Sequence, residues 1–248
     1  PDSGWLPIGA IDIWGDSRSD VVWWNYYSGE LLIWSDGNPK YSVSWATVSP
    51  SLGWIPISVA DFDGDILGDI LWWNFGTGEL LSWLSSNRYA SSSIGSVSTD
   101  SKWYPMSAAD FDNDQKDDIF WWNSDSGEAL AWPLSTDDSA FSFGTVSYRE
   151  TGWAAVGAAD FDGDWLGDIL WWNDRSGELY VWPFDGRGYS RGTVAFNSGW
   201  IPIFNSILPL GTLVSNDGCL QVLNYNSPEE QVFDAKFKDF IAPLQSLK

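Results

Sequence analysis

The sequence contains no histidine, one cysteine and few basic residues. Without histidine it lacks the most common general base and transition-metal ligand, which excludes histidine-based zinc sites and histidine-dependent catalytic triads. Cys219 has no second cysteine with which to form an internal disulfide. Only 12 basic residues stand against 34 acidic ones, so the formal net charge is −22. Phosphate backbones repel such a chain, and we expect no nucleic-acid partner.

Long apolar runs are also missing, because Asp, Asn, Gly or Ser interrupts every hydrophobic stretch. We therefore expect no membrane insertion. The chain begins at Pro1 rather than Met, and we expect a processed or trimmed product from which a signal peptide could have been removed. Hydrophobic residues nevertheless make up 44% of the sequence, enough for a folded core. An acidic chain with almost no cysteine fits a calcium-rich exterior, so we expect an extracellular or secreted protein.

The sequence repeats itself five times, with a tryptophan opening each unit at intervals of about 49 residues. The second unit reads GWIPISVADFDGDILGDILWWNFGTGELLSWL, and the fourth reads GWAAVGAADFDGDWLGDILWWNDRSGELYVWP. The fifth begins GWIPIFNSILPLG and then departs from the pattern. The approximate bounds of the units are 4–52, 53–101, 102–151, 152–198 and 199–248. Together they account for the whole chain as a single domain.

Each unit contains four strand-like segments, of the types GWIPISVA, DILWWN, ELLSWL and SIGSVS. A turn with glycine at a fixed place separates the second segment from the third, which indicates a hairpin. Neighbouring residues on a strand face opposite sides of the sheet, so the paired tryptophans require a sheet covered on both faces. A solenoid would also repeat, but its coils usually carry fewer strands per period. The pattern predicts an all-β, five-bladed β-propeller with four antiparallel strands per blade.

Three units carry a nine-residue acidic loop between the first and second strands, with carboxylates at positions 1, 3, 5 and 9. The loops are DFDGDILGD at 61–69, DFDNDQKDD at 110–118 and DFDGDWLGD at 160–168. Crowded carboxylates repel one another, and calcium, which takes about six to eight oxygen ligands from flexible loops, would relieve that repulsion. The alternative is a solvated turn closed by its own Asx hydrogen bonds, but three copies in one register favour three Ca²⁺ sites.

The predicted ligands are the four carboxylates of each loop and the main-chain carbonyl at position 7. They are Asp61, Asp63, Asp65, Leu67 and Asp69 in the second unit, Asp110, Asp112, Asp114, Lys116 and Asp118 in the third, and Asp160, Asp162, Asp164, Leu166 and Asp168 in the fourth. The first unit keeps Asp12, Asp16 and Asp20 but has Trp14 at position 3. We expect this fourth possible site to be weaker or empty.

The shared phrase DFDGDxxxDILWWNxxxGELxxW resembles the integrin-type FG-GAP repeat and its bacterial relatives, the VCBS repeats. The resemblance covers four of the five units and implies a propeller with calcium loops between the first two strands of its blades. It does not specify a function, because family members include lectins, adhesion heads and parts of extracellular enzymes. The Trp-Asp dipeptide of WD40 repeats and the Gly-Gly pair of kelch repeats are absent.

Aromatic residues without counterparts in most units are the candidate ligand-binding residues: Tyr26, Tyr27, Trp14, Trp45 and Trp165. A sugar ring stacks on an aromatic ring while polar neighbours bind its hydroxyls, although these rings could instead fill gaps between blades. We expect a lectin-like module for a glycan or another neutral polar ligand, rather than an enzyme, and we assign no catalytic residue. The alternatives are a propeller lyase or cyclase with a Tyr, Lys, Asp or Glu base, and a protein-binding adhesion module with a large apolar patch.

Overall fold

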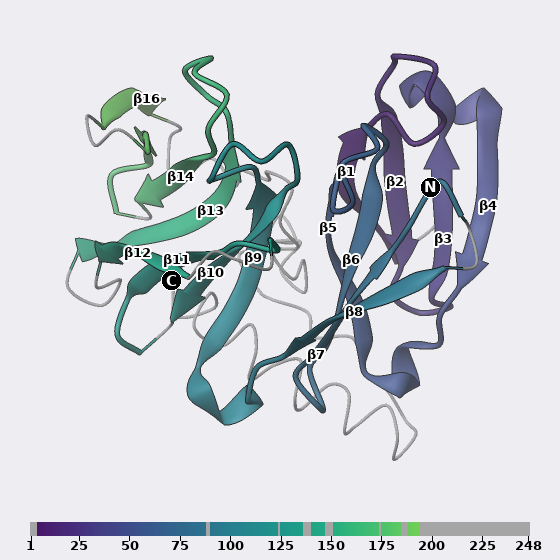
Figure 1. Ribbon diagram of the computed structural model, residues 1–248, viewed down its shortest axis with the longest axis horizontal. Coiled ribbons are helices and arrows are strands. Elements are labelled where there is room, and N and C mark those ends of the chain that lie inside the picture. The colour runs from purple at the N-terminus through teal and green to yellow at the C-terminus, as the bar shows by residue number, and fades with distance from the viewer. Residues whose placement is uncertain are drawn as a thin grey trace, which may run out of the picture.

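The described residues form four antiparallel sheets of four strands each, and each sheet corresponds to one of the first four sequence units (Figure 1). Within every sheet the strands are hydrogen-bonded in sequence order. The structure is a computed structural model, and it describes residues 4–87, 90–123, 125–135, 140–146, 151–173, 175–184 and 188–193.

The strands of the four blades have closely matching lengths. The first blade contains β1 (Trp5–Ile11), β2 (Asp20–Asn25), β3 (Glu30–Trp34) and β4 (Ser42–Thr47). The second contains β5 (Trp54–Ala60), β6 (Asp69–Asn74), β7 (Glu79–Trp83) and β8 (Ser91–Ser96). The third contains β9 (Trp103–Ala109), β10 (Asp118–Asn123), β11 (Glu128–Trp132) and β12 (Phe141–Thr145). The fourth contains β13 (Trp153–Ala159), β14 (Asp168–Asn173), β15 (Glu178–Trp182) and β16 (Tyr189–Thr193). The described residues also contain the short 3-10 turns η1 (Ser35–Gly37), η2 (Pro39–Tyr41), η3 (Pro50–Leu52) and η4 (Thr99–Ser101).

An asparagine at the end of each second strand closes the hairpin to the third. In the second blade the main-chain N–H groups of Gly76 and Thr77 donate to Oδ1 of Asn74, at 2.9 and 3.1 Å. Gly78 then adopts a positive φ of 77°, which glycine reaches without steric cost. The side-chain amide of Asn74 also donates to the carbonyl of Leu52 at 3.0 Å, so the hairpin is fixed to the preceding connection.

The tryptophan pairs lie in the second strands and bury both faces of the sheets. Trp72 and Trp73 of β6 are 1% and 3% exposed, although they point to opposite sides. Every residue of β6, β10 and β14 is buried. Trp73 packs edge-on against Tyr104 of the next blade, with ring centroids 6.1 Å apart. The pairs therefore fill the space between neighbouring blades, as the sequence predicts.

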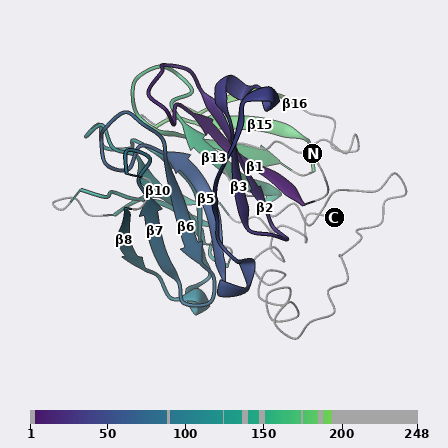
Figure 2. The same cartoon turned by 90° about the vertical axis from the view of Figure 1, so that its right-hand side faces the viewer.

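The blades are arranged with their first strands side by side. β1 contacts β5, β5 contacts β9 and β9 contacts β13, while the fourth strands lie toward the outside (Figures 1 and 2). This is a β-propeller, and the prediction of antiparallel four-stranded blades is confirmed. The described residues form four blades where the sequence predicts five, and the fifth unit, 199–248, lies outside the described residues.

The tryptophan that ends the third strand packs against the blade before it. A Cβ atom placed on Gly95 of β8 would lie 3.4 Å from Cη2 of Trp132, and one on Gly144 of β12 would lie 3.7 Å from Cη2 of Trp182. Both tryptophans also contact the inner tryptophan of their own blade, Trp121 or Trp171. These recurring rings therefore belong to the packing between blades.

Candidate metal centre

The acidic loops join the first strand of each blade to the second, and they lie along the upper side of the molecule in Figure 1. We number each loop from 1 to 9 and name the loops after their blades: first (12–20), second (61–69), third (110–118) and fourth (160–168). Because the first strands run side by side in the same direction around the propeller, all four loops emerge at the same end.

The first aspartate of each loop organises the main chain of the turn. In the second loop the carboxylate of Asp61 accepts hydrogen bonds from the main-chain N–H groups of Gly64, Asp65 and Ile66, at 2.7, 3.2 and 2.7 Å. These bonds hold Ile66 at a positive φ of 68°. In the other loops the N–H at position 6 also donates to the aspartate at position 1. Position 6 is Ser17, Gln115 or Trp165 there, and each has a positive φ. The carboxylate at position 1 therefore shapes the loop even before any ion binds.

The last aspartate of each loop is fully buried and connects three parts of the blade. Asp69 begins β6, and its Oδ2 accepts from the N–H of Phe62 at 3.2 Å, within the loop. Its Oδ1 accepts from the N–H of Ser85 at 2.9 Å, just after β7. Asp20, Asp118 and Asp168 make the corresponding pairs of bonds. Position 9 is thus a structural residue in all four blades, a role that spacing in the sequence does not reveal.

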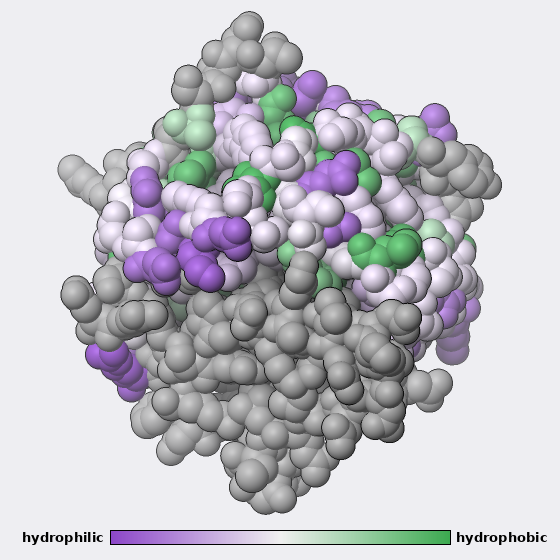
Figure 3. Space-filling view, turned by 90° about the horizontal axis from the view of Figure 1, so that it is seen from below, coloured by the Kyte–Doolittle hydropathy of each residue, from purple (hydrophilic) through white to green (hydrophobic). Residues whose placement is uncertain are grey.

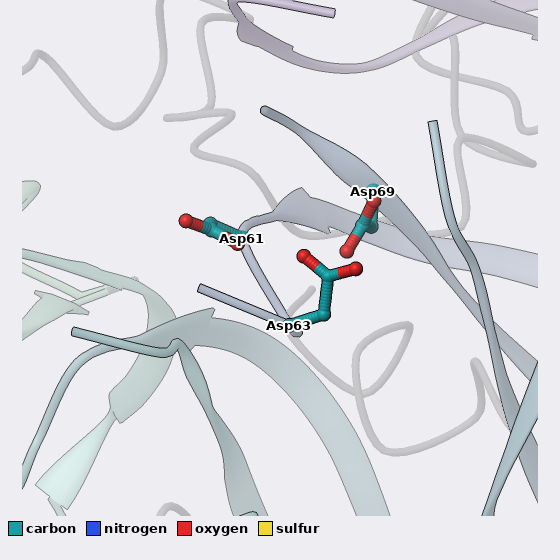
Figure 4. A group of neighbouring side chains, drawn as sticks. All are labelled: Asp61, Asp63 and Asp69. Atoms are coloured by element: carbon teal, nitrogen blue, oxygen red, sulfur yellow. The ribbon is translucent and has the colours of Figure 1, made fainter. Parts of the chain in front are cut away.

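Three carboxylates converge in each of the second, third and fourth loops. In the second loop Asp61, Asp63 and Asp69 each offer an oxygen atom, and these atoms lie within 4.8 Å of one another. Figure 4 shows the carboxylates of Asp63 and Asp69 facing each other, with Asp61 beside them. The equivalent groups are Asp110, Asp112 and Asp118, and Asp160, Asp162 and Asp168. A set of hard oxygen donors on a flexible turn suits Ca²⁺ better than metals that prefer nitrogen or sulfur.

Position 5 is not part of these converging groups. The carboxylate of Asp65 instead accepts from the N–H of Leu67 at 2.9 Å. Asp114 and Asp164 accept in the same way from Lys116 and Leu166, at 2.8 Å each. The ligand roles of position 5 and of the carbonyl at position 7 stay predictions.

Burial and mutual repulsion change the acidity of the converging groups. Removal from water, followed by the charges of neighbouring aspartates, raises the pKa of Asp69 to about 7. The same causes raise the pKa of Asp118 to about 7 and raise the pKa of Asp168. A proton can therefore occupy Asp69 and Asp118 near neutral pH, and a divalent cation would have to displace it.

The first loop differs from the other three. Its aspartates form no group of three converging carboxylates in the described structure. The indole N–H of Trp14, at position 3, donates to Oγ of Ser35 at 3.1 Å, and its ring lies 6.1 Å from that of Trp45. Arg18 forms a salt bridge of 2.8 Å with Asp36 beside the loop. An aromatic side chain thus stands at position 3 in place of the carboxylate found in the other loops, and an ion pair lies beside the loop.

Neighbouring loops are joined to one another by a repeated main-chain hydrogen bond. The N–H at position 8 donates to the carbonyl at position 1 of the preceding loop: Gly68 to Asp12 at 2.7 Å, Asp117 to Asp61 at 2.7 Å, and Gly167 to Asp110 at 2.6 Å. The loops therefore form a continuous series across the described blades.

The five candidate ligand-binding aromatics lie in three separate places. Trp14 and Trp45 form the pair beside the first loop. Tyr26 and Tyr27 lie in the β2–β3 hairpin, at the opposite end of β2, with ring centroids 4.3 Å apart. Burial raises the pKa of Tyr26, so its hydroxyl stays neutral. Trp165 is 79% exposed at position 6 of the fourth loop.

Eight large hydrophobic side chains are exposed among the described residues, and five of them belong to the first unit. They are Trp14, Tyr27, Tyr41, Val43, Leu52, Ile66, Trp165 and Phe184. On the face seen in Figure 3, the hydrophobic areas of the described residues are small and separated by polar ones. No helix in the described part of the chain is long and apolar enough to cross a membrane.

The fold and the loops together define a β-propeller repeat module whose second, third and fourth blades could each hold a metal ion. Residues 12–72 and 61–121 match the family model of the FG-GAP-like repeat. These two overlapping matches confirm the resemblance to FG-GAP-type repeats found in the sequence, over residues 12–121.

Three solved structures show a distant similarity in fold. A streptogramin B lyase structure has 13% identity and a TM-score of 0.45, and the match covers 80% of this chain and 57% of that chain. Virginiamycin B lyase from Staphylococcus aureus, substituted with selenomethionine, has 9% identity and a TM-score of 0.42 over 70% of this chain and 52% of that one. A nidogen/laminin complex has 9% identity and a TM-score of 0.43 over 67% and 56%. The chain thus spans little more than half the length of these structures, and they carry no functional argument. No curated protein matches the chain.

Proposed function

We propose that this chain is an extracellular, calcium-stabilised β-propeller module that binds carbohydrate. The observation that carries the calcium part is the convergence of three carboxylate oxygens, within 4.8 Å of one another, in each of three loops. Their oxygen-only chemistry favours Ca²⁺, while Mg²⁺ usually keeps several waters and uses one or two carboxylates.

The bound ion would act mainly on stability. In the second blade, Asp61 directly follows β5 and Asp69 begins β6, so one ion would hold the two strands together at this end. The ion would also neutralise carboxylates that otherwise repel one another. Asp61, Asp63 and Asp69 would be its ligands, and the third and fourth blades supply the equivalent residues.

Exposed aromatic rings beside polar groups support the carbohydrate part. Trp165 is 79% exposed and adjoins Asp164 in the fourth loop. Trp14, which is 38% exposed, lies close to Ser35 and the Arg18–Asp36 ion pair. Both places combine a flat apolar ring, on which a pyranose can stack, with groups that can bind hydroxyls.

A glycan array followed by calorimetry, both in calcium-saturated buffer, tests this proposal. We expect calorimetry with Ca²⁺ alone to give three ions per chain, and at least one glycan to bind. Trp165→Ala or Trp14→Ala should then weaken glycan binding by about tenfold or more, which identifies the place used. Leu52→Ala, a change at another exposed apolar side chain, is the matched control and should have no effect. Absence of any glycan bound above background would contradict the carbohydrate part, and absence of bound Ca²⁺ would contradict the calcium part.

A further inference from the structure

The boundary between the second and third loops is built differently from the other two. At each boundary one main-chain hydrogen bond links position 8 to position 1 of the preceding loop. At the boundary between the second and third loops, the residue at position 8 makes a second hydrogen bond to the same partner, in the opposite direction. The carboxylate of Asp117 accepts from the N–H of Asp61 at 2.7 Å. Gly68 and Gly167 hold this position in the second and fourth loops, so those boundaries have no such second bond.

Asp117 touches the metal-binding residues of both loops. The N–H of Asp61, the position-1 residue of the second loop, donates to its carboxylate, and the main chain of Asp110, the position-1 residue of the third loop, also favours its charged form against the opposing effect of burial. Asp117 also directly precedes Asp118, the buried ligand of the third site. Asp117 thus binds the first residue of the second site and directly precedes the buried ligand of the third.

A second contact supports the same link. The side chain of Lys116 lies over the second loop, where a Cβ atom added to Gly64 would be 3.4 Å from its Cγ and Cε atoms. The second and third loops are therefore in contact through a side chain as well as through the main chain.

We infer that Asp117 is a positioning residue that makes the second and third sites bind Ca²⁺ cooperatively. This inference rests on the proposed function. An ion bound by Asp61 fixes the peptide group that Asp117 holds, and with it the main chain leading into Asp118. The first ion therefore orders part of the second site, and the next ion binds with a smaller entropy loss.

Calorimetric Ca²⁺ titration of full-length chains measures this coupling. Asp162→Asn silences the fourth site and leaves the second and third, and adding Asp63→Asn or Asp112→Asn leaves one site alone. The coupling factor is the product of the two association constants of the two-site chain, divided by the product of the single-site constants. We expect a factor of about five or more with Asp117, and about one when the series is repeated with Asp117→Gly. Glycine is chosen because the second and fourth loops already carry it at this position.

Two controls separate coupling from general effects. Asp125→Asn removes the same charge from an exposed hairpin and should leave the factor unchanged. The third and fourth sites, studied in an Asp63→Asn chain, have only the single main-chain bond and should couple more weakly. A factor near one with Asp117 present, an unchanged factor in Asp117→Gly, or an equal loss in Asp125→Asn would overturn the inference while leaving the calcium sites in place. Absence of Ca²⁺ binding at all sites would overturn both this inference and the proposed function.

Discussion

Gly68 shows how closely neighbouring loops approach. Its N–H donates to the carbonyl of Asp12, and a Cβ atom at this position would lie 1.9 Å from Cγ2 of Ile11. We expect Gly68→Ala to lower the free energy of unfolding by about 2–3 kcal/mol, because the first and second blades would have to move apart. Urea unfolding followed by tryptophan fluorescence measures the change.

Gly163 provides the matched control for that substitution. It lies in the fourth loop with a φ of 89°, but an added Cβ atom would meet nothing within 4 Å. Gly163→Ala should therefore cost only the backbone strain of about 1 kcal/mol. Equal losses in the two variants would mean that contact between the loops does not explain why glycine occupies position 8.

At the scale of the element, the sequence could predict the place and composition of the acidic loops but only part of their geometry. Register alone placed Asp61, Asp63 and Asp69 on one turn between two strands, and they do converge. Spacing could not show that Asp69 also binds the N–H of Ser85, because this partner lies beyond β7. Spacing also could not show that the carboxylate of Asp65 accepts a hydrogen bond from the N–H of Leu67. A carboxylate on a tight turn can face either an ion or its own main chain, and the sequence does not distinguish the two.

The acidic loops should make the metal-free protein less stable as pH rises. The pKa of Asp69 and of Asp118 is raised to about 7 in the folded chain, from an ordinary value near 4. The folded state therefore binds more protons than the unfolded state between these values, and its stability falls through this range. We expect the free energy of unfolding without calcium to drop by at least about 1 kcal/mol between about pH 5 and pH 7.5.

Urea unfolding at both pH values measures this change, in buffers from which a resin has removed calcium, because chelators lose affinity in acid. With saturating Ca²⁺ the protein should instead be more stable at the higher pH, because the ion competes with protons and binds more tightly there. Stability that is flat or rising with pH in the absence of calcium would contradict the buried, proton-binding state of these aspartates.

At the scale of the whole molecule, the repeat and the tryptophan pairs were enough to predict a propeller of antiparallel four-stranded blades, although the described residues form four blades and not the predicted five. Pairs such as Trp72–Trp73 need cover on both faces, which a blade packed between two others supplies, and both rings are buried. The candidate ligand-binding aromatics were harder to place. An unmatched ring such as Trp45 or Trp165 looks the same in sequence, yet one is half-buried in the first blade and the other is 79% exposed. Exposure depends on contacts between residues distant in the chain, which periodicity does not encode.

Calcium removal tests the propeller as a unit, because each ion would join two strands of a different blade. A ligand present at a hundredfold excess over its Kd stabilises the folded state by about 2.7 kcal/mol per site. Three such sites should raise the Tm of a chain of this size by more than about 10 °C, and EGTA at pH 7.5 should remove that increase. Differential scanning calorimetry with and without EGTA measures the shift. The triple variant Asp63→Asn, Asp112→Asn and Asp162→Asn should show no shift with EGTA, whereas a change below about 2 °C in the unmodified chain would show that calcium does not hold the blades together.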